Sequence, residues 1–335
     1  MIALDDDRLI FRFPEVHPEP ECSIHFQRTL RIPDDGRDYP LPPGLGAFPL
    51  RHLDDHARNV PEQWLKRGGV IMPMHQAEAM WIRFSAGHWR GEGEYPFAIK
   101  IATGKVNAVS GEPWTAHLNR DPQDYVVIPK QPWLDGYCVE KGTIRQFVAM
   151  PLGQGYSVEE QLTGEPEWGG VQILGYPMKS ERYDELCGDR RSMRFLVAES
   201  VERRSPDMGL APGGRMKQEV YDDPYRLEDW DQRHFSRCFV TIANSITWHA
   251  ITGERPPMRP PTAADYARAG LPWFDYYDAD AKALEGSGQL VKTKSIAEMA
   301  KDKGEEPLPE NVSAEVAHIV RLPKQRPAIV REAAF

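Results

Sequence analysis

The chain has 335 residues, 41% of them hydrophobic, and can bury a sizeable core as one large or two modest domains. Its 50 Asp and Glu residues outnumber its 41 Lys and Arg, and the net charge of -9 argues against a nucleic-acid partner, whose phosphates need a basic face. The 4 cysteines form no CxxC pair, which argues against a disulfide framework and a four-thiolate zinc site.

The N-terminal sequence MIALDDDRLIFRF has aspartates where a secretory signal needs basic residues. No apolar run is long enough to span a membrane, so we expect a soluble, cytoplasmic protein without a membrane partner. Residues 8–13 and 24–32 predict strands, because apolar and polar residues alternate in the second segment. Arg28 falls on its apolar face, where a guanidinium must pair with a carboxylate, reach water or anchor a ligand.

Residues 52–68 predict short helices, with Asp54 capping the first, Pro61 opening the second and Gly68 ending it. His52 and His56 have the i, i+4 spacing of many metal ligands. However, HLDDH lacks the glutamate of the zincin motif, and a cap at Asp54 would leave His52 outside the helix. We therefore favour a solvated helix start and expect no metal; His52 and His56 are the candidate ligands if a metal binds.

Residues 70–110 predict a strand-rich region in which Met80, Ile82 and Phe84 share one face. Residues 95–109 predict a hairpin that turns at Thr103-Gly104-Lys105. This TGK triplet is no phosphate loop, because Ile99 and Val106 occupy positions where the motif needs Gly and Ser or Thr. No glycine pattern of a dinucleotide-binding fold is present either, so we expect no cofactor.

Residues 124–164 contain two predicted strands, 125–128 and 143–150, around a turn that carries Trp133, Asp135 and Tyr137. Gln146 lies among apolar neighbours on the second strand. Ser157 and Glu160 form a capping-box pair for a helix that ends at Gly164.

Further along, we expect a strand at 171–178, a helix near 180–187, a solvated linker over 188–213 and a long strand over 237–251. Gln218 repeats the pattern of Gln146 between Met216 and Val220. We interpret both glutamines as buried amides bonded to the backbone, with a polar pocket shared with Arg28 as the alternative.

The C-terminal part predicts a Pro-rich hinge, a helix capped by Thr262, an aromatic helix over 271–286 and a polar arm over 286–335. The predicted fold is α+β and β-rich, with a mainly antiparallel sheet or sandwich core, short peripheral helices and a C-terminal helical or extended arm. We expect residues 1–255 to form the core domain and residues 256–335 the hinge, short helices and arm.

No catalytic motif is recognisable, which leaves two main hypotheses. The first is a binding or assembly protein whose aromatic loops, around Trp114, Trp133 and Trp273, and C-terminal arm contact a protein partner or a second copy of the chain. The second is a cofactor-independent small-molecule enzyme with an acid–base pocket around the inward Arg28. Its candidate catalytic residues are Arg28, His75, Asp135, Tyr137, Gln146, Gln218 and Glu219.

Overall fold

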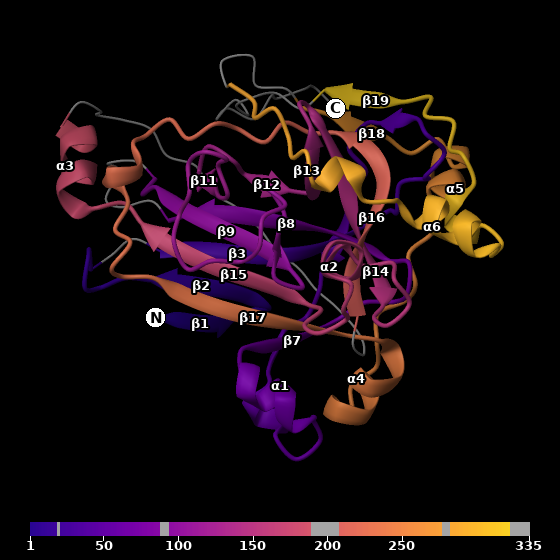
Figure 1. Cartoon of the computed structure of the whole chain (residues 1–335), viewed down its shortest axis with the longest axis horizontal. Helices are drawn as coiled ribbons and strands as arrows, with labels where there is room; N and C mark the ends of the chain where they lie inside the picture. The colour runs from indigo at the N-terminus through magenta and orange to yellow at the C-terminus, as the bar shows by residue number, and fades with distance from the viewer. Residues whose placement is uncertain (19–20, 88–93, 189–207, 277–281, 322–335) are drawn as a thin grey trace, which may run out of the picture.

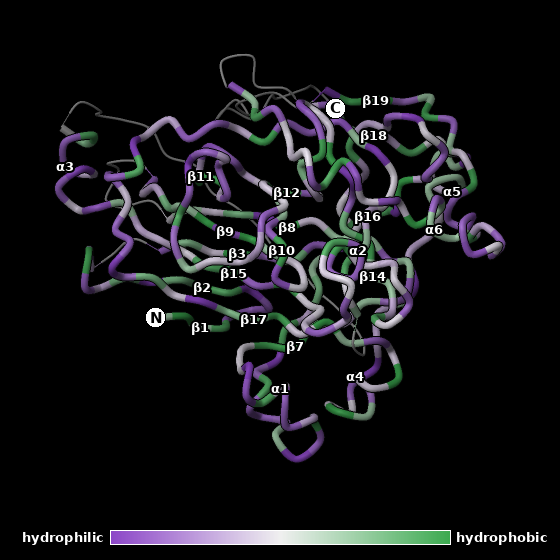
Figure 2. Tube along the Cα trace, in the orientation of Figure 1, coloured by the Kyte–Doolittle hydropathy of each residue, from purple (hydrophilic) through white to green (hydrophobic). Residues whose placement is uncertain are grey.

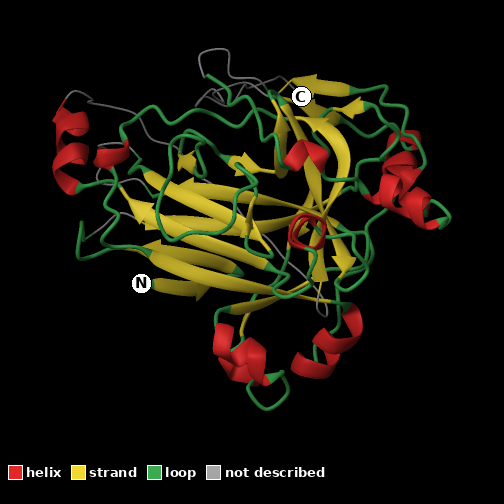
Figure 3. Ribbon diagram, in the orientation of Figure 1, coloured by secondary structure: helices red, strands yellow, loops and turns green. Residues whose placement is uncertain are grey.

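The computed structural model describes residues 1–18, 21–87, 94–188, 208–276 and 282–321. Strands fill the centre of this part of the chain, and short helices lie at its periphery (Figure 3). Within it, β4–β16, β7–β17 and β18–β19 pair in parallel, and the other strand pairs are antiparallel. The predicted β-rich α+β class is confirmed.

The larger sheet is 10-stranded, in the order β1-β2-β3-β8-β14-β16-β4, with β5, β12 and β13 paired to β3, β8 and β14. Its strands are β1 (Ile2–Asp5), β2 (Arg8–Arg12), β3 (Glu21–Thr29), β4 (Asp38–Tyr39), β5 (Gly44–Ala47), β8 (Ala79–Ala86), β12 (Trp133–Leu134), β13 (Gly136–Glu140), β14 (Thr143–Pro151) and β16 (Met208–Lys217).

The second sheet is 7-stranded, in the order β10-β9-β15-β17-β7-β6, with β11 paired to β9. Its strands are β6 (Arg51–His52), β7 (Val70–Pro73), β9 (Phe97–Thr103), β10 (Val106–Asn107), β11 (Val126–Ile128), β15 (Val171–Pro177) and β17 (Ser236–Ala243). A 2-stranded sheet joins β18 (Trp273–Asp275) to β19 (Ile319–Arg321).

The helices are short and surround the sheets (Figure 1). They are α1 (Glu62–Arg67), α2 (Val158–Thr163), α3 (Ser180–Gly188), α4 (Ser245–Thr252), α5 (Ala263–Arg268) and α6 (Ile296–Lys303), besides 3-10 turns. In the described part of the chain, no helix combines the length and the apolar character that a membrane crossing requires.

One hydrophobic core cluster draws side chains from both large sheets. Phe11 of β2 and Ile99 of β9 belong to it, and Figure 2 shows hydrophobic residues along the central strands such as β9. The two sheets approach so closely at Gly175 of β15 that a Cβ atom there would lie 3.0 Å from the Phe11 ring. A side chain at this point of the core would force the Phe11 ring to shift by a few tenths of an ångström, which glycine avoids.

Several predicted local structures are confirmed. Thr103-Gly104-Lys105 turns between β9 and β10, and α1 is followed by Gly68 at its C-cap. Ser157 and Glu160 form a complete capping box at α2, and Thr262 accepts a backbone hydrogen bond at the start of α5. These signals are local, so the sequence alone contains them.

The predicted solvated linker over 188–213 is wrong where the structure describes it. Residues 189–207 lie outside the described residues, but residues from 208 onward form β16, which pairs with β14 inside the larger sheet. Its sequence, MGLAPGGRMK, lacks β-branched residues and therefore resembles a loop. The glycines permit close packing instead, because a Cβ at Gly213 would lie 2.5 Å from Val148.

The predicted strand over 237–251 is too long. Strand β17 ends at Ala243, and the Asn244 side chain accepts the Ile246 N–H to start α4. The apolar run continues through this boundary because Trp248 and Ile251 of α4 are also buried. Hydrophobicity alone could not separate strand from helix here.

The predicted aromatic helix over 271–286 is also wrong. Trp273 to Asp275 form β18, and residues 277–281 lie outside the described residues. Trp273 is fully buried in the main core cluster, and Phe274 exchanges backbone hydrogen bonds with Leu41. Strand β18 thus packs on the preceding chain, while the domain boundary at 255 stays a prediction.

Candidate functional site

Arg28 is buried in an ion pair. Its guanidinium lies 2.6 Å from Oε1 of Glu78, and the two side chains are 9% and 1% exposed. Arg28 also donates to the Met258 carbonyl, and the other Glu78 oxygen accepts the backbone N–H of His75. The expectation of a carboxylate partner is confirmed, and the guanidinium is used to hold three chain segments together.

His75 belongs to the same structural network. Its Nε2 lies 2.8 Å from the Pro257 carbonyl oxygen. Burial raises the pKa of Glu78, and the charge of Arg28 lowers it in part. The network therefore ties residues 257 and 258 to the larger sheet, and neither Arg28 nor His75 lines the cavity described below.

Gln146 and Tyr137 have structural roles. The Gln146 amide accepts the Ile32 N–H at 2.8 Å and donates to the Leu30 carbonyl at 2.9 Å, which confirms a buried amide bonded to backbone. The fully buried Tyr137 hydroxyl contacts Thr103 and donates to the Leu210 carbonyl. With these bonds made, neither side chain presents a free polar group to a ligand.

Gln218 holds Asp135. Its Oε1 accepts the Asp135 backbone N–H at 2.9 Å, and its Nε2 donates to the Asp135 carboxylate at 2.6 Å. Glu219 follows on the chain and lines a small neighbouring cavity, where its carbonyl accepts a bond from Gln131. The alternative pocket shared by Arg28, Gln146 and Gln218 is not formed, because these residues bond to separate partners.

His52 and His56 do not share a helical face. His52 ends β6, and His56 ends a 3-10 turn whose N-cap is Leu53 without a side-chain cap bond, so the predicted Asp54 cap is wrong. Among the described residues, no group of three or more His, Cys, Asp or Glu side chains is placed to hold a metal ion.

Asp135 lies at a cavity of about 190 Å³ between four parts of the chain. Trp81 comes from β8, Trp133 from β12 and Phe274 from β18, and Leu41, Pro42 and Gly44 complete the wall. The Tyr276 ring packs against Trp133 at 4.9 Å between centroids. We call Trp81, Trp133, Phe274 and Asp135 the aromatic cage.

Local sequence explains how the aromatic cage forms. Trp81 alternates with the buried Met80 and Ile82 on β8, so it faces away from the core. Trp133 pairs in register with Arg83 on the neighbouring strand. The backbone bonds between Leu41 and Phe274 then bring the C-terminal strand β18 against the loop that follows β4.

Asp135 is 4% exposed as a residue, and burial raises the pKa of its carboxyl to about 7. Hydrogen bonds from Trp133 and Gln218 favour the ionised form and offset part of this increase. Among the described residues, no cation contributes to the shift. The cage therefore contains a carboxyl that can change its charge near neutral pH.

This pKa predicts how stability depends on pH. Between the unfolded value of about 3.9 and the folded value, the native carboxyl retains a proton that the unfolded chain has lost. The free energy of unfolding should therefore fall as pH rises in this window, by up to about 1.4 kcal/mol per pH unit from this group.

Asp135→Asn removes this titration, so the stability of the variant relative to wild type should increase from about pH 4.5 to about pH 7.5. Urea unfolding of both proteins across this range measures the difference. Other buried carboxyls titrate in both proteins, so their contributions cancel in the difference between the two free energies of unfolding. A difference that stays constant with pH would contradict the assignment.

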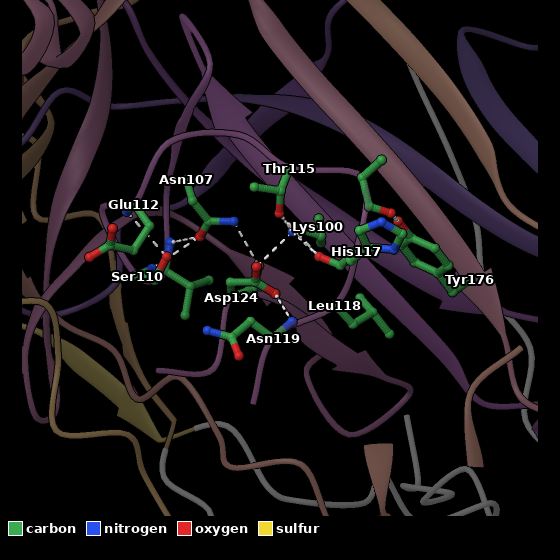
Figure 4. Close-up of polar contacts among 12 residues, drawn as sticks. Lys100, Asn107, Ser110, Glu112, Thr115, His117, Leu118, Asn119, Asp124 and Tyr176 are labelled. Carbon is green, nitrogen blue, oxygen red and sulfur yellow. Dashed lines mark hydrogen bonds and ion pairs between the residues drawn. The ribbon is translucent and has the colours of Figure 1, made fainter. Parts of the chain in front are cut away.

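A second polar network surrounds Lys100 of β9 (Figure 4). Its ammonium is 2.6 Å from Asp124 Oδ2, 3.1 Å from Thr115 Oγ1 and 2.5 Å from the His117 carbonyl. The three contacts match the three N–H donors of the ammonium group. Asn119 donates to the other Asp124 oxygen, so this buried pair has a structural role.

Sequence reasoning did not identify Trp81 or Lys100. Both lie one residue out of phase with the apolar residues used to recognise their strands, Met80 and Ile82 for one and Ile99 and Ile101 for the other. Successive residues of a strand point to opposite faces, so a ring such as Trp81 or a buried charge such as Lys100 is found among the residues between the apolar ones.

The chain matches no protein-family model, no curated protein and no solved structure.

Proposed function

We propose that the protein is a binding protein that captures a methylated or quaternary ammonium group in the aromatic cage. The observation that carries the proposal is the buried Asp135 carboxyl, without a cationic partner among the described residues, in a cavity walled by Trp81, Trp133 and Phe274. Aromatic faces attract cations through their quadrupole, and cages of this composition recognise quaternary ammonium groups.

Charge complementarity supports a cationic ligand. Taking a carboxylate out of water is costly, and the raised pKa of Asp135 reflects that cost. A ligand cation would offset it and lower the pKa again, because an opposite charge within ~4–6 Å favours the ionised form. Binding should therefore tighten as pH rises through about 7, since the carboxylate form of Asp135 becomes available.

The size of the cavity supports a small group. Its volume of about 190 Å³ is below the ~300–1,000 Å³ of pockets that enclose drug-sized ligands. Trp81, Trp133 and Phe274 are each only partly buried, so the ligand can extend past them into solvent. An ammonium head at the end of a longer molecule, such as a methylated lysine of a partner protein or a free choline-like compound, fits these dimensions.

This proposal narrows the binding hypothesis drawn from the sequence. Trp133 belongs to the aromatic turn expected to contact a partner, and Phe274 belongs to the C-terminal part. We also propose that the C-terminal arm contacts a protein partner or a second copy of the chain.

Removing one ring tests the cage. We expect Trp133→Ala to weaken binding of choline at least about tenfold, because a desolvated cation–π contact contributes about 2 kcal/mol. Trp133→Phe keeps a ring but loses the hydrogen bond to the Asp135 carboxyl, so its affinity should lie between that of Trp133→Ala and that of wild type. Isothermal titration of each variant measures the effect.

Trp168→Ala is the matched control, since Trp168 is also partly buried but does not line the cage. It should leave choline binding unchanged. Equal affinity of Trp133→Ala and wild type would overturn the proposal.

Acid–base catalysis is the second candidate function, and the pKa of Asp135 near 7 favours it. A general acid or base works best when its pKa lies near the operating pH. If the protein is an enzyme, we propose that Asp135, and not Arg28, is its general acid or base. NMR spectra of a bound ammonium compound distinguish the two functions, since a binding protein leaves the ligand unchanged and an enzyme converts it.

A further inference from the structure

A basic pocket lies apart from the residues of the aromatic cage, at the end of the second sheet. It has a volume of about 370 Å³, within the range of ligand pockets. Its cations are Lys66 and Arg67 of α1, Lys105 of the β9–β10 turn and Arg237 of β17. No Asp or Glu is among the described residues that line it. Four cations thus gather on a chain whose net charge is -9.

Three of these cations lack a carboxylate partner among the described residues. Arg67 donates to the carbonyl oxygens of Trp168 and Glu167, which carry no formal charge. The Lys105 ammonium lies 3.2 Å from the centre of the Trp168 ring, and Arg237 is exposed at the rim. Lys66 contributes least, because it is exposed and paired with Glu62.

The backbone fixes the direction of Lys105. Gly104 and Lys105 both have positive φ, at 55° and 59°, as a two-residue hairpin turn requires. The Lys105 N–H donates to Oε1 of Gln172 at 2.6 Å, which holds the turn against β15. A glycine at position 105 would adopt this backbone more readily than lysine does, so the chain keeps a strained residue whose side chain reaches the pocket.

Partly buried aromatic rings complete the walls. Trp114, Trp168 and Phe239 line the pocket, and Arg67 lies 5.3 Å from the Phe239 ring centre. Such rings stack well on planar ligands. Cys238 also lines the pocket, but burial raises the pKa of its thiol to about 12, so it stays protonated and is no nucleophile.

We infer that the basic pocket binds a small ligand that combines a phosphate group with a planar ring, such as a mononucleotide. The phosphate would contact Lys105, Arg67 and Arg237, and the ring would pack against the partly buried aromatic rings that line the pocket. Unpaired cations favour the anion, and low-dielectric walls strengthen the attraction. The site lacks a Walker A loop and differs from it, because side chains and not backbone N–H groups supply the charge.

Titration of the full chain with AMP, adenosine and inorganic phosphate at one ionic strength tests the inference. We expect AMP to bind at least about tenfold more tightly than adenosine, because a charge-assisted hydrogen bond to the phosphate is lost in the nucleoside. Inorganic phosphate should also bind more weakly than AMP. Equal affinity of AMP and either fragment, or no saturable AMP binding at millimolar concentration, would overturn the inference.

Lys105→Gly separates binding from folding. It removes the ammonium and relieves the positive φ, so the melting temperature should stay the same or rise while AMP affinity falls about tenfold. Lys301→Gln, an exposed lysine on α6, is the control and should leave AMP affinity unchanged. AMP affinity unaffected by Lys105→Gly, or reduced equally by the control, would contradict the assignment. Neither result bears on the aromatic cage, whose ligand is a cation.

Discussion

Lys100→Met is expected to lower the free energy of unfolding by about 3–5 kcal/mol, because it leaves the buried Asp124 carboxylate without its cation. Lys100 is 1% exposed, and methionine cannot replace the contacts to Thr115 and His117. Burial already raises the pKa of Asp124, so the orphaned carboxyl can take up a proton at low pH. The loss should therefore be smaller at pH 5 than at pH 8. Urea unfolding at both pH values measures it.

Lys141→Met is the control for this prediction. Lys141 also forms an ion pair at 2.6 Å, with Glu285, but both side chains are exposed and water screens the pair, so its loss should leave stability almost unchanged. The double variant Lys100→Met/Asp124→Asn removes the charge as well as its partner and should recover part of the stability. A single variant that is no less stable than the control would show that the pair is not structural.

Arg28→Met is expected to lower the free energy of unfolding by a similar amount, about 3–5 kcal/mol, since Glu78 would remain buried without its cation. The variant also loses the hydrogen bond to the Met258 carbonyl, which joins the C-terminal part to the larger sheet. Replacing both partners, in Arg28→Met/Glu78→Gln, keeps an acceptor for the His75 N–H and should be milder than the single change. Chemical denaturation of both variants gives the comparison.

Arg12→Met provides the reference for an exposed pair. Arg12 lies 2.8 Å from Glu21, but both side chains are about half exposed, so its removal should change stability by no more than about 1 kcal/mol. If Arg28→Met lowered the free energy of unfolding as little as Arg12→Met, Arg28 would not be needed for stability. That result would favour the hypothesis of an acid–base pocket in which Arg28 binds a ligand.

The sequence predicted features that depend on near neighbours along the chain. The capping box at Ser157, the turn at Gly104 and the alternation around Arg28 are examples. Residues 208–213, the end of the predicted linker, were misread because glycine has a low strand propensity, whereas the close packing of Gly213 against Val148 is a tertiary contact. The strand–helix boundary at Asn244 was missed because the apolar run continues on both sides of it.

The candidate site could be predicted only in part. Asp135 and the aromatic turn at Trp133 were identified from their residue types, but their neighbours Trp81 and Phe274 are distant in sequence. Gln218 was singled out for its place in a strand, yet its partner Asp135 lies 83 residues away. No single segment contains the aromatic cage. It could be recognised only once the order of strands in the sheet and the packing of β18 were known.

Comparison of choline with 3,3-dimethylbutan-1-ol tests the central claim most directly. The two molecules have nearly the same shape, but only choline carries a charge. The aromatic cage with Asp135 predicts saturable binding of choline that is at least about tenfold tighter than binding of the alcohol, and a smaller ratio in Asp135→Asn. Equal affinity for both would mean that the cavity recognises apolar shape alone, which would contradict an ammonium site.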